Sequence, residues 1–441
     1  MSGGKAKRSD AVKKRDKSIF LTTTREEFGP VVDHGDGEYV YSVDGDKILD
    51  FSSFVSVYNL GVNSNARIRS AIKSQVDKLM HGAFTDYYAE LPVTFGESLL
   101  EMMPKGFGKL FLSNSGTEAN EAAIKFSHIF TGRKYNLAFY NSFHGRTNGS
   151  LGLTSSKAVQ REHFGPFTGT IHVPFANCYR CPFKQEYPGC GFACVDYIKK
   201  YPLSKEVGAK EVAAFFVEPI QGEGGYIVPP KDYFKEIKRI TDANGILLVS
   251  DEVQSGYMRT GKFLALDNFG VTADIYTMAK ALGAGLPIGA TITKSSLGDL
   301  PEGAHSNTFG GNLAVVAGAL ESLKQVKANR QTLESDVLVK GRFVMKRLEE
   351  MKERYEIVGD VRGIGLMTAI EFVKDKKSKT PAIEERRAVL KKSLELGLLL
   401  LPAGESSIRI IPPLTISKTS LEKGMDMLES AVREVSKTRK R

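Results

Sequence analysis

The most constraining feature of this 441-residue chain is a series of strands that are apolar throughout and alternate with amphipathic helices. Strand-like runs such as AAFFVEP (213–219) and GILLVSDE (245–252) lack polar alternation, which indicates burial on both faces. Helix-like segments such as DYFKEIKRITDAN (232–244) lie between them. This alternation predicts an α/β fold around a mainly parallel central sheet flanked by helices.

The net charge of +10 is concentrated at the two ends of the chain. Residues 1–17 carry seven Lys/Arg against two Asp, and residues 433–441 carry five against one Glu. Because these ends contain no interleaved aromatics, they favour solvated, flexible tails over a nucleic-acid surface. No apolar run reaches the ~18 residues that a membrane span needs. The N-terminus lacks the apolar region of a secretory signal, so we expect a cytoplasmic protein without membrane partners.

Polar residues that could bind a ligand or take part in catalysis follow several of the predicted strands. Asp251 follows ILLVS, Lys280 follows DIYTMA, and the turn 113–117 (SNSGT) opens directly into a helix. Ligands of such sheets bind beyond the carboxyl ends of the strands, and a helix N-terminus is a natural phosphate seat. The small apolar surroundings of Lys280 predict a lowered pKa, as a nucleophilic amine requires. A phosphate seat, a carboxylate and a poised lysine together match the requirements of pyridoxal 5'-phosphate (PLP).

Seven motifs, in order along the chain, strengthen this interpretation. From residue 29 to 415 the sequence resembles the class III aminotransferases of PLP fold type I, which include 4-aminobutyrate, ornithine and acetylornithine aminotransferases. The motifs that carry the resemblance are SNSGTEANEAAIK, FHGRT, EPIQGEGG, SDEVQSGYMRTGKF, DIYTMAKALGAGLPIGA, TFGGN and IRIIPPL.

The resemblance implies a large PLP-binding domain (76–325) and a smaller α+β domain built from the N- and C-terminal segments (21–75 and 326–441), after a basic flexible tail (1–20). It implies that Lys280 forms the Schiff base and that Asp251 holds the pyridine nitrogen. It also implies a homodimer with shared active sites, in which Thr308 reaches the phosphate of the neighbouring subunit. The other residues that it places at the cofactor are Ser115, Gly116, Thr117, Phe143, His144, Val253 and Gln254.

The resemblance also implies a set of substrate residues. Arg146 matches a position that grips the distal carboxylate in 4-aminobutyrate aminotransferases, and Arg409 matches the arginine that binds the α-carboxylate of glutamate or 2-oxoglutarate. Glu223 matches the acid that pairs with Arg409 when an ω-amino substrate is bound. Glu218 lies near the ring, and Val55 takes the substrate-facing position. No residue is implied to bind a metal.

Two departures from the family pattern fall on the entry side of the pocket. The usual G-H-x-H-P reads GVNSNAR at 61–67, and Phe54 replaces a small residue ahead of Val55. Because substrate choice is set on this side, the departures bear on the substrate and not on the PLP chemistry.

These features predict transfer of an amino group from an ω-amino acid, with 4-aminobutyrate as the best candidate, to 2-oxoglutarate. An amino-acid racemase or epimerase of the same fold is the first alternative, and an ornithine or lysine ω-aminotransferase is the second. A zinc-stabilised nucleic-acid-binding module has support only from the cysteines and the basic tails.

All four cysteines of the chain lie within residues 178–194, in a C-x2-C-x8-C-x3-C pattern. Structural zinc sites usually pair two C-x2-C knuckles, and only the first half has that spacing. Zinc, disulfides and free thiols all remain open, and the spacing favours the two non-metal states.

Overall fold

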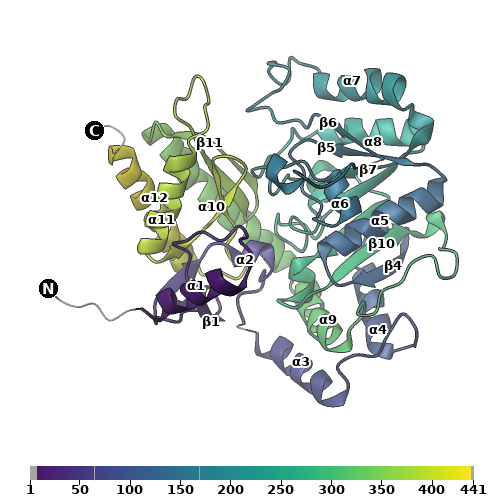
Figure 1. Cartoon of the computed structure of the whole chain (residues 1–441), viewed down its shortest axis with the longest axis horizontal. Coiled ribbons are helices and arrows are strands. Elements are labelled where there is room, and N and C mark those ends of the chain that lie inside the picture. The colour runs from purple at the N-terminus through teal and green to yellow at the C-terminus, as the bar shows by residue number, and fades with distance from the viewer. Residues whose placement is uncertain (1–6, 64, 168, 439–441) are drawn as a thin grey trace.

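A seven-stranded sheet forms the centre of the larger unit in the computed structural model, which describes residues 7–63, 65–167 and 169–438 (Figure 1). The strand order is β4-β10-β9-β8-β7-β5-β6, and only β10 runs antiparallel to its neighbours. The prediction of a mainly parallel central sheet is therefore confirmed. The strands are β4 (Phe107–Ser113), β5 (Tyr135–Phe139), β6 (Thr170–Val173), β7 (Val212–Val217), β8 (Leu247–Asp251), β9 (Ile275–Ala279) and β10 (Gly289–Lys294).

Helices cover this sheet because its central strands are buried on both faces. All six residues of β7 and all five of β9 are buried, as their unbroken apolar sequences predict. Helix α8 directs Phe234, Ile237 and Ile240 into the core, and it ends at Gly245, which has φ +60°. The covering helices are α5 (Gly116–Thr131), α6 (Asn148–Leu153), α7 (Ala193–Lys200) and α8 (Tyr233–Asn244).

The smaller unit joins the two ends of the chain. Strand β13 (Leu398–Leu399) pairs in parallel with β3 (Lys47–Asp50), which extends the N-terminal strands β1 (Val32–Asp36) and β2 (Tyr39–Ser42). A second sheet contains β11 (Val358–Ile364), β12 (Met367–Phe372), β15 (Ser407–Ile410) and β14 (Leu401–Ala403), in that order. The α+β unit predicted from the N- and C-terminal segments is therefore present.

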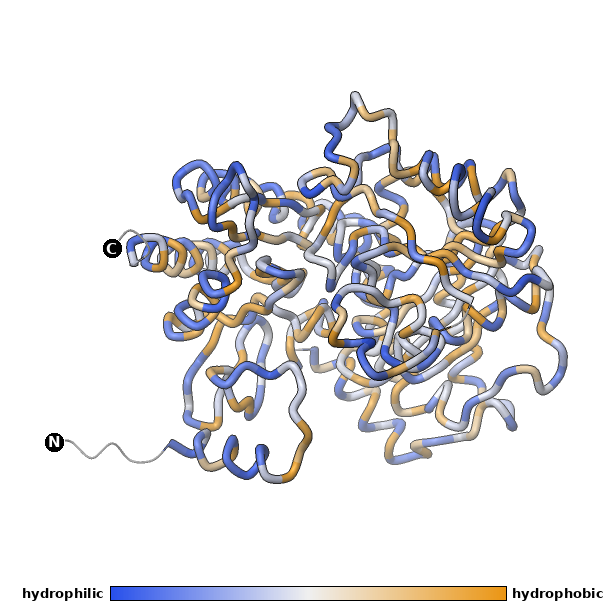
Figure 2. Tube along the Cα trace, turned by 45° about the horizontal axis from the view of Figure 1, so that its top comes forward, coloured by the Kyte–Doolittle hydropathy of each residue, from blue (hydrophilic) through white to orange (hydrophobic). Residues whose placement is uncertain are grey.

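Long amphipathic helices pack on the sheets of the smaller unit. Helix α12 alternates hydrophilic and hydrophobic residues along its turns (Figure 2), and it buries Leu421, Met425 and Leu428. Charged residues occupy its outer face. The helices of this unit are α10 (Arg330–Arg354), α11 (Ile383–Glu395) and α12 (Lys418–Thr438).

Three helices lie along the lower edge of the molecule in Figure 1. Helix α3 (Ala66–Lys78) packs along α9 (Leu313–Ala328), and α4 (Glu90–Leu100) packs on the same helix. The predicted domain boundaries at 75/76 and 325/326 fall inside α3 and α9, and they stay predictions.

The basic N-terminal segment differs from the flexible tail that its charge predicted. Helix α1 (Arg8–Ile19) forms there, and residues 1–6 lie outside the described part of the chain. Arg25 pairs with Asp16, and Lys17 pairs with Glu27 at 2.9 Å, so local charge pairs support the helix. Within the described residues, no helix is both long and apolar enough to cross a membrane.

Candidate active site

The carboxyl ends of the central strands open into a cavity of about 560 Å³. Asp251 ends β8, Lys280 follows β9 directly, and Glu218 follows β7. All three line the cavity, as the topology of a parallel sheet requires. The other predicted residues that line it are Ser115, Gly116, Thr117, Phe143, His144, Arg146, Val253 and Gln254.

Asp251 is held by three donors. Its Oδ2 lies 2.8 Å from His144 Nδ1 and accepts a hydrogen bond of 2.7 Å from Asn120 Nδ2. Its Oδ1 accepts from the Val253 N–H at 3.0 Å. The motifs did not single out Asn120, although its place in the first turn of the predicted helix EANEAAIKFSHIF, after the phosphate-seat turn, was the available signal. The three contacts fix the carboxylate in one orientation at the cavity floor.

Burial lowers the pKa of Lys280, and the negative charge of Asp251 opposes that shift. Lys280 has φ +50°, a left-handed conformation that non-glycine residues adopt at a cost. A strained backbone conformation and a lowered side-chain pKa at one cavity-lining lysine are typical of a reactive amine. The residues that line the cavity therefore include a nucleophile and an acid on neighbouring strands.

The first turn of α5 lines the same cavity as Lys280. The Ser115 side chain caps the helix by accepting from the Glu118 N–H at 3.2 Å, and the N–H groups of Gly116 and Thr117 have no partner inside the helix. A Cβ atom on Gly116 would lie 2.7 Å from Val253 Cγ1. Only glycine allows this close approach, so the helix N-terminus meets the cavity as an unobstructed anion seat.

Glu218 is a buried acid beside the same cavity. Its Oε1 accepts from the Phe143 N–H and its Oε2 accepts from the Gly222 N–H, each at 2.8 Å. Burial raises the pKa of Glu218 to about 7. The side chain therefore changes its charge near neutral pH at the edge of the cavity.

Glu223 and Arg409 form an ion pair next to the cavity. Arg409 Nη2 lies 2.6 Å from Glu223 Oε1, and the same guanidinium donates to Pro402 O and to Gln254 Oε1. Burial raises the pKa of Glu223, but the charge and hydrogen bond of Arg409 more than offset this and leave that pKa below its usual value. The arginine of β15 is thus fully occupied by protein groups.

Four predicted residues lie outside the cavity lining: the Glu223–Arg409 pair beside it, and Val55 and Thr308. Val55 does not line it, whereas Val57, two residues later, does. Thr308 is exposed on the loop before α9, where its neighbour Asn307 donates to Leu112 O at 2.9 Å. Arg146 is exposed at the rim, 5.5 Å from the Phe143 ring centroid, and has no acidic partner within 4 Å among the described residues. The dimer role of Thr308 and the substrate role of Val55 stay predictions.

The segment that presents Val57 is a left-handed turn. Ser53, Phe54, Val55 and Ser56 have φ between 41° and 64°, which sequence propensity does not predict. The fully buried Arg259 holds this turn by donating to Ser56 Oγ at 3.1 Å and to nearby backbone carbonyls. The unusual backbone at the cavity mouth therefore depends on tertiary hydrogen bonds.

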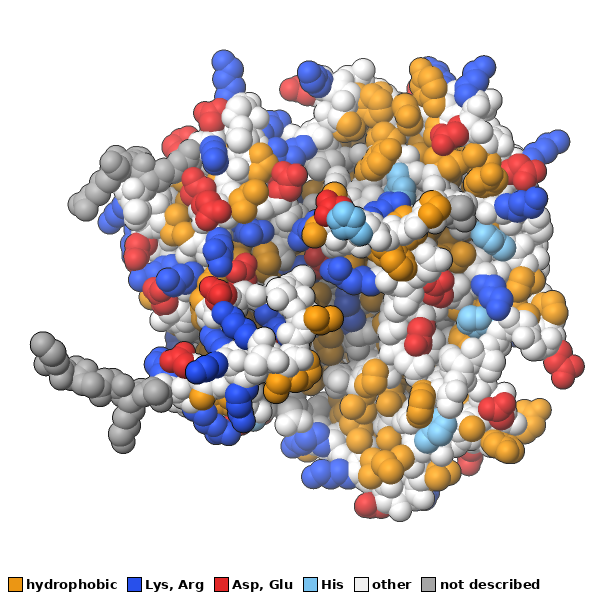
Figure 3. Space-filling view, viewed as in Figure 1, with side chains coloured by type: hydrophobic (Ala, Val, Ile, Leu, Met, Phe, Trp, Pro, Cys, Tyr) orange, Lys and Arg blue, Asp and Glu red, His pale blue; other side chains and the backbone are white. Residues whose placement is uncertain are grey.

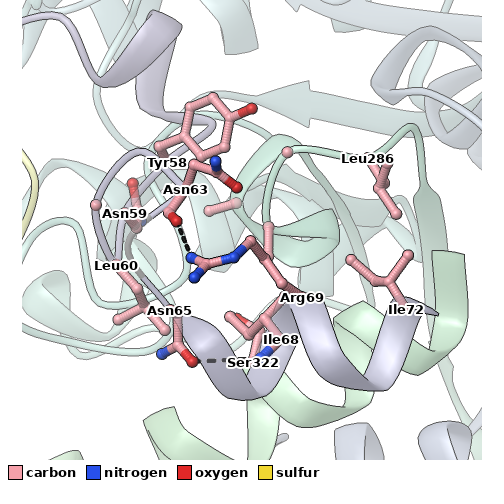
Figure 4. A pocket seen from close by; sticks show the side chains of 14 residues that line it. Tyr58, Asn59, Leu60, Asn63, Asn65, Ile68, Arg69, Ile72, Leu286 and Ser322 are labelled. Carbon is pink, nitrogen blue, oxygen red and sulfur yellow. Dashed lines mark hydrogen bonds between the residues drawn. The ribbon is translucent and has the colours of Figure 1, made fainter. Parts of the chain in front are cut away.

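A smaller cavity of about 140 Å³ adjoins the wall formed by Gly285 and Leu286, which also line the main cavity. The atypical segment GVNSNAR contributes Asn63 and Asn65 to it, and Arg69 donates to Asn63 O (Figure 4). The segment that departs from the family pattern thus places the amides of Asn63 and Asn65 beside this smaller cavity.

The four cysteines line a cavity of about 20 Å³; three lie on the loop before α7, and Cys194 lies in the first turn of that helix. Their thiols are free, and burial raises the pKa of Cys194 to about 12. Among the residues that the structure describes, no group of three or more His, Cys, Asp or Glu side chains is arranged to hold a metal ion.

Comparison with known proteins identifies the architecture that carries this site. The family model "Aminotransferase class-III" matches residues 22–432. The chain belongs to the class-III aminotransferase family. A Bacillus anthracis aminotransferase structure superposes with a TM-score of 0.89 at 29% identity, over 98% of this chain and 100% of that chain.

Curated relatives of this class-III chain carry more than one activity. It is 39% identical to a leucine/methionine racemase of Thermococcus litoralis over 98% of this chain and 97% of the relative. It is 34% identical to an acetylornithine aminotransferase of Clostridium acetobutylicum over 94% of this chain and 99% of the relative.

The family is PLP-dependent, and the residues of this cavity fit that cofactor. Lys280 supplies a buried amine, Asp251 an oriented carboxylate for a protonated ring nitrogen, and α5 a helix N-terminus for the phosphate. Phe143 and Val253 supply apolar surfaces on the cavity walls. The donor set therefore matches the three recognisable parts of the cofactor.

Proposed function

We propose that this class-III enzyme transfers the amino group of an ω-amino acid, 4-aminobutyrate being the best candidate, to 2-oxoglutarate. The observation that carries the proposal is the Glu223–Arg409 ion pair at 2.6 Å, together with the unpaired Arg146 at the rim. Arg409 is a carboxylate-binding arginine that Glu223 covers, and Arg146 is a second one that is free to bind a substrate carboxylate.

The ion pair favours an enzyme with two substrates, only one of which carries a carboxylate on the reacting carbon. An ω-amino donor has no carboxylate beside its amine, so an uncovered Arg409 would face it as an uncompensated buried cation. A 2-oxo acid has such a carboxylate and needs Arg409 free. Glu223 covers Arg409 for the first substrate and swings away for the second. A racemase has an α-carboxylate on both substrate and product, so it has no use for this cover.

The side chains of the cavity then divide the work. PLP, when bound, withdraws electrons from the amine-bearing carbon of the substrate and acidifies its C–H bond. Asp251 keeps the ring nitrogen protonated, and His144 and Asn120 hold Asp251 in place. Lys280, whose pKa is lowered by burial, accepts the proton from that carbon and returns it as a general acid. Arg146 binds the distal carboxylate and orients the donor.

The proposal includes a homodimer. Large apolar side chains gather on the face around α3 and α4 (Figure 3), beside the loop of Thr308. Exposed apolar patches of this kind mark interfaces. A second copy seated there would bring Thr308 toward the partner's phosphate seat. The exposed apolar residues in this region are Val76, Leu79, Met80, Tyr87, Tyr88, Val93 and Phe309.

A second candidate function is racemisation of an apolar 2-amino acid. The 39% identity to a leucine/methionine racemase over nearly the whole chain favours it, as does 33% identity to an alanine/serine racemase of Pyrococcus horikoshii over 95% of this chain and 89% of that relative.

Ornithine or lysine ω-transamination uses the same cavity with a cationic donor, which the unpaired Arg146 disfavours.

A substrate panel tests the proposal. Purified holoenzyme is incubated with 4-aminobutyrate, ornithine, lysine, leucine or methionine, each with and without 2-oxoglutarate, and glutamate and D/L ratios are measured. The proposal expects glutamate from 4-aminobutyrate only when 2-oxoglutarate is present. Loss of optical purity of leucine without any oxo acid, and no glutamate from any ω-amine, would establish the racemase instead.

A further inference from the structure

We propose that Arg180, on the cysteine-rich loop, is a positioning residue for the loop that carries Glu223. It acts through a relay of charged groups, Arg180–Glu371–Arg362, that begins at the half-buried Arg180 and ends on the backbone of Gly225 and Tyr226. The functional consequence rests on the proposed function, because it concerns the Glu223 cover of Arg409; the positional one does not.

The first link joins two parts of the chain that are distant in sequence. Arg180 Nε donates to Glu371 Oε1 at 2.7 Å, so the loop of residues 178–194 is tied to strand β12. The side chain of Glu371 is only 6% exposed. A buried carboxylate requires compensating charges, and Arg180 is one of its two cationic partners.

The second link passes from Glu371 to the Glu223 loop. Arg362 Nη2 lies 2.8 Å from Glu371 Oε2, and Arg362 Nη1 lies 2.8 Å from Asp360 Oδ2. Arg362 Nη2 also donates to Gly225 O at 2.5 Å, and its Nε donates to Gly225 O and Tyr226 O. The guanidinium therefore grips the backbone two residues beyond Glu223.

The backbone of the loop that carries Glu223 is tightly constrained. Gly225 has φ +119°, and a Cβ atom there would lie 3.1 Å from Arg362 Nη2. Gly404 N–H donates to Glu223 O at 2.8 Å, which secures the other side of the same turn. The tip with Glu223 is thus held between the β14–β15 connection and the relay, in the position from which its side chain contacts Arg409.

The cysteine-rich loop is itself clasped by the smaller unit. Lys379 Nζ donates to Tyr179 O at 2.8 Å and lies 4.6 Å from the Tyr179 ring centroid. All four cysteines of this segment line one small cavity. Because these contacts fix the cysteine-rich loop, Arg180 is held in place beside Glu371.

Removing Arg180 leaves Glu371 with one cation instead of two. Glu371 and Asp360 then compete for Arg362, and its grip on Gly225 O weakens. Glu223 covers Arg409 less completely, which penalises the ω-amino donor and leaves the oxo-acid half of the reaction largely unaffected. Network substitutions of this kind change coupling by roughly twofold to thirtyfold.

Hydrogen exchange of the full-length holoenzyme tests the positional claim without substrate. Arg180→Gln is compared with Arg180→Lys and with Arg347→Gln, a matched control in which a part-buried arginine loses its partners Asp426 and Glu429. We expect faster amide exchange in residues 221–227 of Arg180→Gln, partial restoration in Arg180→Lys, and no change in Arg347→Gln. Unchanged exchange in 221–227 of a folded Arg180→Gln would overturn the proposal.

Half-reaction kinetics test the consequence for the substrate. For Arg180→Gln we expect KM for 4-aminobutyrate to rise by roughly twofold to thirtyfold, with KM for 2-oxoglutarate within about twofold of wild type. Equal loss in both halves would contradict the positioning role and indicate a general defect. If the wild-type enzyme uses no ω-amine at all, the proposed function fails, while the exchange result still decides whether Arg180 positions the loop.

Discussion

Arg409 Nη2 lies 2.6 Å from Glu223 Oε1, and this ion pair joins the sheet of the smaller unit to the loop that follows β7. The arginine also donates to Pro402 O and Gln254 Oε1, so each of its three nitrogens has a protein acceptor. An α-carboxylate binds Arg409 only by replacing Glu223. In the proposed reaction, the choice between the ω-amino donor and the oxo acid therefore depends on the position of one carboxylate.

Removing that carboxylate's charge separates the two halves of the reaction. In Glu223→Gln we expect KM for 4-aminobutyrate to rise about tenfold or more, because Arg409 loses its neutralising partner. Glutamate, which brings its own carboxylate, should bind at least as well as in wild type. Single-turnover kinetics with each amine provide the measurement, and an equal loss for both amines would contradict the assigned role.

Asn120 is expected to orient Asp251, although sequence analysis did not single it out. Asn120→Ala removes the 2.7 Å hydrogen bond to Oδ2 and leaves the His144 contact in place. Outer partners of this kind change activity by about tenfold to a hundredfold. We expect kcat to fall within that range and the cofactor to stay bound, as measured by kcat and by bound PLP per chain. Wild-type kcat in the variant would show that Asn120 is dispensable.

The left-handed turn at the cavity mouth depends on Arg259. This side chain is completely buried, and Arg259→Lys keeps its charge but loses the fork that reaches Ser56, Asn59 and Pro412 O. We expect the free energy of unfolding to fall by about 3 kcal/mol, in the range for broken buried polar networks. Urea denaturation checks the prediction. A change in the free energy of unfolding below about 0.5 kcal/mol would show that the turn does not depend on Arg259.

Glu252 gives the fold a defined pH dependence. Burial raises its pKa from 4.5 to about 7, and it accepts from the Ala265 and Leu266 N–H groups at 2.9 Å. Because the folded pKa lies above the unfolded one, its contribution to stability is complete below about pH 4.5 and is lost as pH rises through 7. Glu252→Gln should therefore flatten the stability profile between these pH values. Parallel profiles of Tm against pH for the two proteins would refute this.

The sequence predicted the features that follow from periodicity and strand ends. Unbroken apolar strands predicted the parallel sheet, and because Asp251 and Lys280 follow neighbouring strands, their convergence on one cavity was predictable. The motif resemblance added His144 and Gln254, which single residues could not have indicated. All of them line the same cavity.

Other features depend on contacts between distant segments and left little local signal. The left-handed turn at Ser53–Ser56 is stabilised by Arg259, some 200 residues away, so propensity alone favours other conformations there. The link from Arg180 to Glu371 spans 191 residues and has no sequence signature. Helix α1 formed where charge alone predicted a flexible tail, because its residues find acidic and basic partners nearby.

The most direct test of the account is one turnover of the Lys280-bound cofactor with a stoichiometric amount of 4-aminobutyrate and no oxo acid. The visible absorbance of the bound cofactor is followed while the released aldehyde is quantified. We expect the Lys280-bound form to disappear, one aldehyde to form per active site, and 2-oxoglutarate to restore the original spectrum. An unchanged spectrum with 4-aminobutyrate, together with conversion of L-leucine to D-leucine by the same preparation, would contradict it.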